Sequence, residues 1–342
     1  MRVRAARQAR RATWHHEAGE VLTAGVWTER AAGLGEDAEP LLAHHRPSGH
    51  GLLAVFDGAG GSGAGLAGHN GDGVPRSGAW VAARVARATT EEWFHEVVTR
   101  RTGDDPETLR LALSERLGHM HRPGARSILG TMRRALPTTV AALRYRPHPA
   151  GLAWQAYWAG DSRCFLLDPA HGLQQVSRDD TEESDALVLL TQDPPMTNVA
   201  CADREFRVNR AAGETALPVT MVCATDGFFG YVHTPAGFEH VLLSTLAAAR
   251  DLGHWAELLA DDVTGYTGDD ASLAVVAIGH GGFGELRARF AGRTRYVADE
   301  HWLPLRHALG GGHEQVATAR ADSWSRYRHG YERLMPWPGG TS

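Results

Sequence analysis

The sequence predicts a mixed α/β domain whose strands pair antiparallel. Short apolar runs rich in valine, leucine and aromatic residues recur along the chain, with stretches of helical periodicity between and after them. One apolar run, residues 154–167, is interrupted only by Gly160-Asp161-Ser162, a turn composition that favours a tight antiparallel hairpin. A doubly wound parallel sheet is therefore disfavoured. The length of 342 residues, 43% of them hydrophobic, allows a substantial core.

Six strands are expected, each an apolar run bounded by turn or polar residues: 52–56, 138–143, 153–159, 163–167, 219–224 and 272–278. Helices are expected at 78–98, 109–117, about 126–135, 236–250, 254–263, 283–291 and about 314–334. The clearest helix start is Asp105-Pro106, because aspartate is a good N-cap and proline fits the first helical position. The polar stretch 177–209 has little periodicity and is long enough to be a functional loop or flap.

These elements divide the chain into three parts. A basic segment at residues 1–20 is expected to be flexible, residues 21–282 to form the main domain, and residues 283–342 to form a C-terminal helical extension packed on the core. The basic start of the chain is followed by no continuous apolar segment, so it is neither a secretory signal nor a membrane anchor.

Composition excludes several classes of function. The formal net charge of -5 provides no global basic field, and no basic patch with interleaved aromatics accompanies the acidic motifs, so a nucleic-acid binder is not expected. Cys164, Cys201 and Cys223 are few and scattered, which argues against a disulfide framework and fits a reducing cytoplasm.

Acidic residues stand at the edges of four predicted strands, next to glycine or another small residue. Asp57 follows the run 52–56 and is followed by glycine, and Asp226 follows the run 219–224 in the same way. Asp161 lies in the Gly-Asp-Ser-Arg turn, and Asp269-Asp270 comes just before the strand 272–278. In an antiparallel sheet, residues after some strands and before others can meet at one edge, so we expect these carboxylates to converge. Each Asp-Gly pair taken alone is more often a plain turn.

A group of converging carboxylates requires cations. The negative charges repel one another and raise each other's pKa unless cations neutralise them. Oxygen-only ligands suit Mg²⁺ or Mn²⁺, whereas zinc prefers nitrogen and sulfur. The pattern therefore predicts a site for hard divalent cations.

At this point the sequence resembles the metal-dependent protein phosphatases of type 2C. The likeness spans about residues 27–280 and rests on five motifs in family order: Val55-Phe56-Asp57-Gly58-Ala59-Gly60-Gly61, Thr138-Thr139-Val140-Ala141, Gly160-Asp161-Ser162-Arg163, Ala224-Thr225-Asp226-Gly227 and Asp269-Asp270-Ala271-Ser272. The resemblance implies two antiparallel sheets sandwiched between helix layers. It also implies hydrolysis of phosphoserine and phosphothreonine by a hydroxide that bridges two Mn²⁺ or Mg²⁺ ions. Expected partners are a phosphoprotein substrate and a cognate serine/threonine kinase in bacterial signalling.

The resemblance also assigns roles residue by residue. Asp57 resembles the bridging metal ligand and Gly58 the carbonyl ligand beside it. Asp226 and Asp269 resemble ligands of the first metal, and these two aspartates with Asp57 are the expected catalytic residues. Glu36 resembles an acidic residue in the shell of the second metal, and Asp161 resembles the acidic group at a weaker third ion.

Three positions depart from the family pattern. Gly230 replaces an acidic residue often found after the Asp-Gly turn, a change that we expect to be tolerated. Ala32 stands where the phosphate-binding arginine usually lies, so the nearest arginine, Arg30, becomes the expected substrate-binding residue. Ala59 stands where many members have histidine or methionine. The missing arginine leaves open a second function, a pseudophosphatase that acts as a regulatory binding module, although such a module gains nothing from a cluster of like charges.

Overall fold

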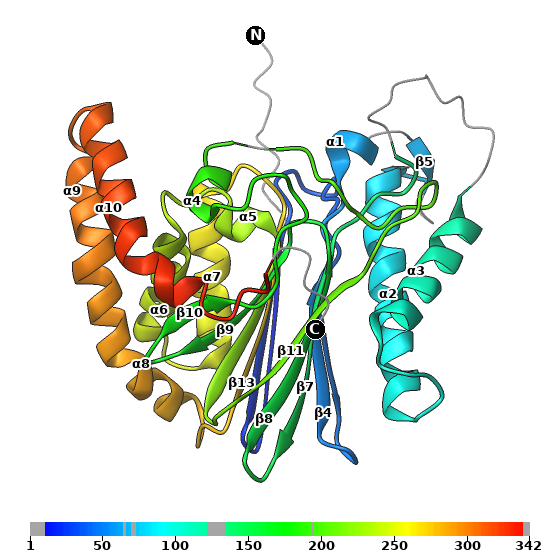
Figure 1. Cartoon of the computed structure of the whole chain (residues 1–342), viewed down its shortest axis with the longest axis horizontal. Coiled ribbons are helices and arrows are strands. Elements are labelled where there is room, and N and C mark those ends of the chain that lie inside the picture. The colour runs from blue at the N-terminus through cyan, green and yellow to red at the C-terminus, as the bar shows by residue number, and fades with distance from the viewer. Residues whose placement is uncertain (1–10, 64–65, 70–72, 122–133, 193, 338–342) are drawn as a thin grey trace.

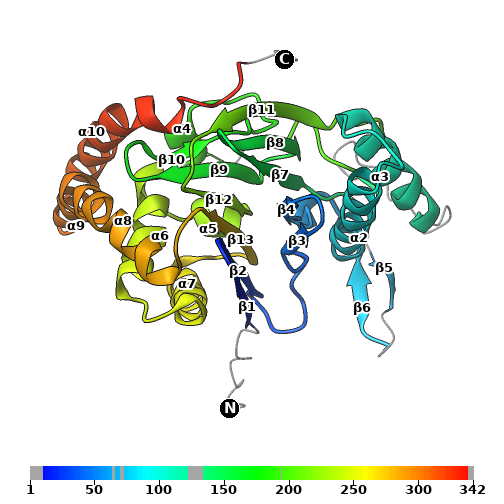
Figure 2. The same cartoon turned by 90° about the horizontal axis from the view of Figure 1, so that it is seen from below.

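The computed structural model describes residues 11–63, 66–69, 73–121, 134–192 and 194–337. Two antiparallel sheets pack face to face, with helices outside each of them (Figure 1). Helices α2 (Gly78–Val98) and α3 (Pro106–Met120) cover one sheet, and α6 (Pro235–Ala248) and α7 (Leu252–Tyr266) cover the other (Figure 2). The predicted sandwich of two sheets between helix layers is confirmed.

The larger sheet has six strands in the order β1-β2-β13-β12-β9-β10. Their bounds are β1 Arg11–Ala18, β2 Val21–Thr28, β13 Ala271–Ile278, β12 Val219–Ala224, β9 Arg163–Asp168 and β10 Gly172–Gln175. The smaller sheet has the order β11-β8-β7-β4-β3, and a separate hairpin joins β5 and β6. These strands are β11 Asn209–Thr215, β8 Gly151–Ala159, β7 Val140–His148, β4 His50–Val55, β3 Leu41–His45, β5 Leu66–His69 and β6 Pro75–Ser77.

All six predicted strands form, but the predicted hairpin is wrong. Strand β8 pairs with β7 and β11, whereas β9 pairs with β10 and β12 in the other sheet. The turn Gly160-Asp161-Ser162 therefore carries the chain from one sheet to the other. Gly160 has a φ of 104°, and a Cβ there would lie 2.7 Å from the Thr139 side chain, so a residue without a side chain is required.

The N-terminal prediction also needs correction. Residues 11–18, expected within a flexible segment, form edge strand β1, paired with β2 from Arg11↔Thr28 to Ala18↔Val21. Most side chains of this strand are exposed. Edge strands with one solvated face lack the apolar run that marks a central strand, which explains why β1 was not predicted.

The predicted helices agree well with the structure where it describes them. Helix α2 has the expected bounds, and the Asp105 side chain caps α3 by accepting from the backbone N–H of Thr108 at 3.0 Å. The helix expected at about 126–135 lies mostly outside the described residues, and residues 134 and 135 are not helical. Among the described residues, no helix combines the length and apolarity needed to cross a membrane.

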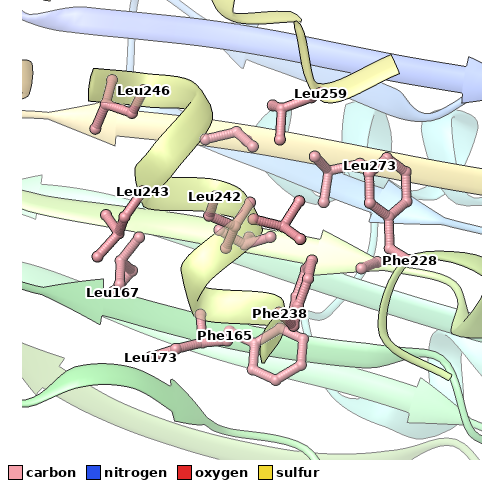
Figure 3. Packing of buried hydrophobic residues seen from close by; sticks show 14 of the residues in the cluster. Phe165, Leu167, Leu173, Phe228, Phe238, Leu242, Leu243, Leu246, Leu259 and Leu273 are labelled. Carbon is pink, nitrogen blue, oxygen red and sulfur yellow. The ribbon is translucent and has the colours of Figure 1, made fainter. Parts of the chain in front are cut away.

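Three buried apolar layers hold the sandwich together. One lies between the sheets, one under α2 and α3, and the largest under α6, α7 and the C-terminal helices. In the largest layer, Leu242, Leu243 and Leu246 of α6 face strands that carry Phe165 and Leu273 (Figure 3). Each fully buried leucine stabilises the fold by about 2 kcal/mol. All three cysteines are buried and free, so no disulfide joins them.

The C-terminal extension consists of α8 (Phe283–Val297), the π-helical turn η1 (Ala298–Trp302), α9 (Leu303–Ala308) and α10 (His313–Tyr331). It docks on Glu239 of α6, whose side chain is fully buried. Arg293 donates to both Glu239 oxygens at 2.7 and 3.0 Å, and the Tyr327 hydroxyl donates to Oε2 at 2.5 Å. Trp324, Tyr327 and Tyr331 are buried against the same layer.

Candidate functional site

A cleft of about 670 Å³ opens at one end of the sandwich. Among the described residues, seven carboxylates line it, contributed by the loop after β2, the ends of β4 and β12, the β8–β9 turn and the start of β13: Glu36, Asp37, Asp57, Asp161, Asp226, Asp269 and Asp270. The structure thus brings together all the metal-ligand candidates, Gly58 included.

Asp57 is fixed through its backbone by the Thr138-Thr139 motif. The Thr138 hydroxyl and the Thr139 N–H both donate to the Asp57 carbonyl at 2.8 Å, and the Asp57 N–H donates to Thr139 Oγ1 at 3.1 Å. Thr139 Oγ1 also lies 2.6 Å from Ser162 Oγ, one residue from Asp161. These buried hydroxyls therefore connect the loop after β4 with the turn between the sheets and set the relative positions of two acidic residues.

Glu36 packs closely against the glycines that follow Asp57. Its side chain accepts a hydrogen bond from Ser77, the residue that also caps α2. A Cβ at Gly58 would lie 2.8 Å from the Glu36 carbonyl, and a Cβ at Gly60 would collide with the Glu36 carboxylate. Glycine at these positions permits this close approach.

Asp37 and Asp270 also line the cleft, although neither is among the metal ligands that the sequence predicts. Asp37 is 2% exposed and accepts from the Thr225 hydroxyl at 2.9 Å. Asp270 accepts from the backbone N–H groups of Arg30 at 2.8 Å and Glu36 at 2.6 Å. Asp270 thereby holds the loop that carries Glu36. Both residues adjoin a predicted ligand, and this adjacency was the available signal.

The carboxylates perturb one another strongly. Burial, followed by the charges of neighbouring aspartates, raises the pKa of Asp57 well above its usual value, and the same causes raise the pKa of Asp37. Burial and the charges of Asp226 and Asp179 raise the pKa of Asp161 to about 8, although Arg163 opposes the shift. A positive charge placed among these groups is therefore favourable.

The donor set fits a hard divalent cation that keeps part of its water shell. As the side chains stand, no three His, Cys, Asp or Glu residues in the described part of the chain form a ready-made group of direct ligands. Mg²⁺ retains several waters and is usually held by one or two carboxylates. A cleft of this volume with an acidic wall offers both the oxygen ligands and room for water.

The arginines of the site differ from the expectation. Arg30 is exposed, and its side chain is not among the residues that line the cleft. Arg134 and Arg204 do line it, on two segments joined by the hydrogen bond from Ala202 N–H to the Ala135 carbonyl at 2.8 Å. Neither was singled out in the sequence, because each lies outside the family motifs.

Arg163 of the Gly-Asp-Ser-Arg motif has a structural role. Its guanidinium is buried, donates to Asp179 at 2.6–3.1 Å and to the Tyr331 hydroxyl at 3.2 Å, and lies 4.2 Å from the centre of the Phe229 ring. Arg163 is therefore held by Asp179, 16 residues further along the chain, and by Tyr331 of α10.

The predicted flap segment, residues 177–209, borders the cleft. Pro194, Pro195, Met196 and Val199 line it, and the short helix α4 (Ala186–Leu189) precedes them. Helices α4, α5 (Asp226–Phe229) and α1 (Gly60–Gly63) all lie at the same end of the sandwich (Figure 1).

No protein-family model matches the sequence, and no curated protein matches it. Solved structures do match. A bacterial serine phosphatase carrying an arginine-to-lysine mutation is 14% identical over 80% of this chain and 98% of its own, with a TM-score of 0.50. The Mycobacterium tuberculosis serine/threonine phosphatase PstP/Ppp is 16% identical over 80% and 99%, with a TM-score of 0.48. RsbX, solved in complex with magnesium, is 12% identical over 78% and 100%, with a TM-score of 0.49.

The first of these similarities defines a class of fold. The chain has the fold of the bacterial serine phosphatases, so the resemblance expected from the five motifs is confirmed at the level of the fold. The extra helices at the C-terminal end are part of the observed architecture.

Proposed function

We propose that this chain is a Mg²⁺- or Mn²⁺-dependent phosphatase that hydrolyses phosphoserine and phosphothreonine in phosphoproteins. The observation that carries the proposal is the gathering of seven carboxylates and two arginines of the described residues around one cleft. The fold shared with a bacterial serine phosphatase supports it.

The acidic wall would hold the cations. Asp57, Asp226 and Asp269 with the Gly58 carbonyl are the ligands we assign, and Glu36 and Asp161 extend the set. A bound divalent ion lowers the pKa of water towards neutrality and offsets the charge of the phosphate. Burial and the repulsion between neighbouring carboxylates raise the pKa of Asp57 and Asp161, and they are the physical reason for these residues to prefer the ion-bound state.

The arginines would orient the substrate. In the described part of the chain, Arg134 and Arg204 bring guanidinium groups to the cleft wall, and a guanidinium can bind two oxygens of a phosphate at once. They would take over the role that the missing arginine at Ala32 leaves open. Neither His nor Cys occurs among the described residues that line the cleft, so the proton for the leaving hydroxyl would come from water.

The test is release of phosphate from a phosphothreonine peptide by the purified protein, titrated with Mn²⁺ and repeated with Asp226→Asn. We expect metal-dependent release that the substitution abolishes, because a ligand is lost. Asp299→Asn is the matched control, since it makes the same chemical change at an exposed residue of η1. Absence of release at every metal concentration would favour the pseudophosphatase instead.

A further inference from the structure

The flap segment, residues 177–209, is held by contacts with other parts of the chain. It connects β10 to β11, its described residues form one short helix, α4, and it borders two pockets. One is the acidic cleft. The other, of about 330 Å³, shares Asp161, Asp226, Asp269 and Pro194 with it and is lined by residues 189–192. The position of this segment therefore shapes access to the carboxylates.

Helix α10 of the C-terminal extension binds the flap segment at Asp185. One oxygen of Asp185 caps α4, accepting from the N–H groups of Leu187 at 2.9 Å and Val188 at 3.3 Å. The other oxygen accepts from Trp324 Nε1 at 3.2 Å and Arg328 Nη1 at 2.9 Å. A single carboxylate thus joins the flap helix to α10 with both of its oxygens.

Two further contacts fix the beginning of the segment. Arg178 Nε donates to the Pro336 carbonyl at 2.8 Å, just beyond α10. Tyr331 of α10 accepts from Arg163, which forms a buried ion pair with Asp179. The C-terminal extension therefore contacts the segment at three places: Arg178, Asp179 through Arg163, and Asp185.

The path from these contacts to the cleft is short. Helix α4 ends at Leu189, five residues before Pro194, and Pro194, Pro195 and Met196 line the cleft. Five residues of chain limit how far these three can move once Asp185 is held.

We propose that helix α10 positions the flap segment, with Trp324 and Arg328 as positioning residues, and thereby controls how a phosphoprotein substrate reaches the carboxylates. The identity of the substrate rests on the proposed function. The inference that α10 holds the flap segment in place does not depend on the proposed function.

The experiment compares Arg328→Gln and Trp324→Phe with wild type in the full chain. Arg326→Gln is the matched control, because Arg326 lies on the same helix and is paired with Glu300, outside the flap segment. Amide hydrogen exchange at residues 186–192 should become about two- to fivefold faster in both test variants and stay unchanged in the control, since a half-exposed charged contact is lost. Arg328→Lys should restore part of the protection.

Kinetics provide the second readout. We expect the KM for a phosphothreonine peptide to rise about two- to fivefold in Arg328→Gln, with kcat for the small substrate p-nitrophenyl phosphate unchanged. Unchanged exchange in both test variants would overturn the proposal. If the wild type released no phosphate, the proposed function would fail, while exchange would still decide whether α10 holds the segment. Arg328 is about half exposed, so its substitution tests the proposal even if Trp324→Phe fails to fold.

Discussion

Two regions of this molecule bury carboxylates, and they do so in opposite ways. At the C-terminal extension, Glu239 is enclosed together with Arg293 and Tyr327, which donate to it. Burial alone would lower the pKa of Arg293, but the hydrogen bond and charge of Glu239 outweigh it, and the pKa is raised. In the cleft, Asp37, Asp57 and Asp161 lie among other carboxylates, and burial and mutual repulsion raise their pKa values.

This difference between the two regions distinguishes a structural role of buried charges from a functional one. A buried charge that the chain itself neutralises fastens one element to another. Buried charges that repel one another lower the stability of the fold. A bound cation that supplies the positive charge would explain their presence. The first kind of region should respond to mutation mainly in stability, and the second mainly in activity and in its dependence on metal and pH.

The largest effect is expected at the buried pair. Arg293→Met should lower the free energy of unfolding by about 3–5 kcal/mol, because it leaves the Glu239 carboxylate buried without its cation. Urea denaturation measures this. Arg289→Met is the control: its pair with Glu285 is exposed, so the free energy of unfolding should change far less. Equal losses in the two variants would contradict the structural role of the buried pair.

Asp57→Asn should lower the activity and leave the stability unimpaired. Phosphate release at saturating Mn²⁺ should fall by about 10²–10³-fold, because a ligand is lost from the centre of the site. In EDTA the same variant should be at least as stable as wild type, since one of several repelling charges is gone. Turnover near the wild-type value would remove Asp57 from the mechanism.

The pH dependence of stability should reveal the repelling charges directly. The pKa of Asp161 is raised from 3.8 to about 8, so the folded chain binds this proton more tightly than the unfolded chain. The resulting contribution to stability is fully present below pH 3.8 and is lost as the pH rises through about 8. The free energy of unfolding in EDTA should therefore fall as the pH rises from about 4 to about 8.

Excess Mn²⁺ should reverse much of this loss at pH 8, by about 2.7 kcal/mol at a hundred times its dissociation constant. Asp161→Asn should flatten the pH profile, whereas Asp299→Asn should leave it unchanged. If the free energy of unfolding of the wild type in EDTA did not depend on pH in this range, the carboxylates of the cleft would not destabilise the fold.

The smallest effect concerns the arginines. Arg204→Ala and Arg134→Ala should each raise the KM for a phosphothreonine peptide about tenfold, because each removes a charged donor from the cleft wall. Arg30→Ala, whose side chain lies outside that wall, should change the KM less than about twofold. The reverse ranking would restore Arg30 as the phosphate-binding residue.

Local sequence determined much of this protein. Strong apolar runs such as 219–224 and 272–278 formed the predicted strands, and the Asp105-Pro106 signal formed the predicted helix start. These elements could be predicted because periodicity and capping act between residues close in the chain. Strand β1 gave no such signal, since it owes its order to pairing with β2.

Tertiary structure decided which residues share a site. Thr138 lies beside Gly58 because of an antiparallel bridge, and Asp270 reaches the N–H of Glu36 because β13 pairs with β2. The same long-range pairing gave the turn at Asp161 its place between two sheets, where a hairpin had been expected. Side chains far apart in sequence meet only through strand register and sheet packing, and these depend on the whole chain. The sequence alone thus identified five of the seven carboxylates described in the cleft, while the fold brought them together and placed α10 beside the flap segment.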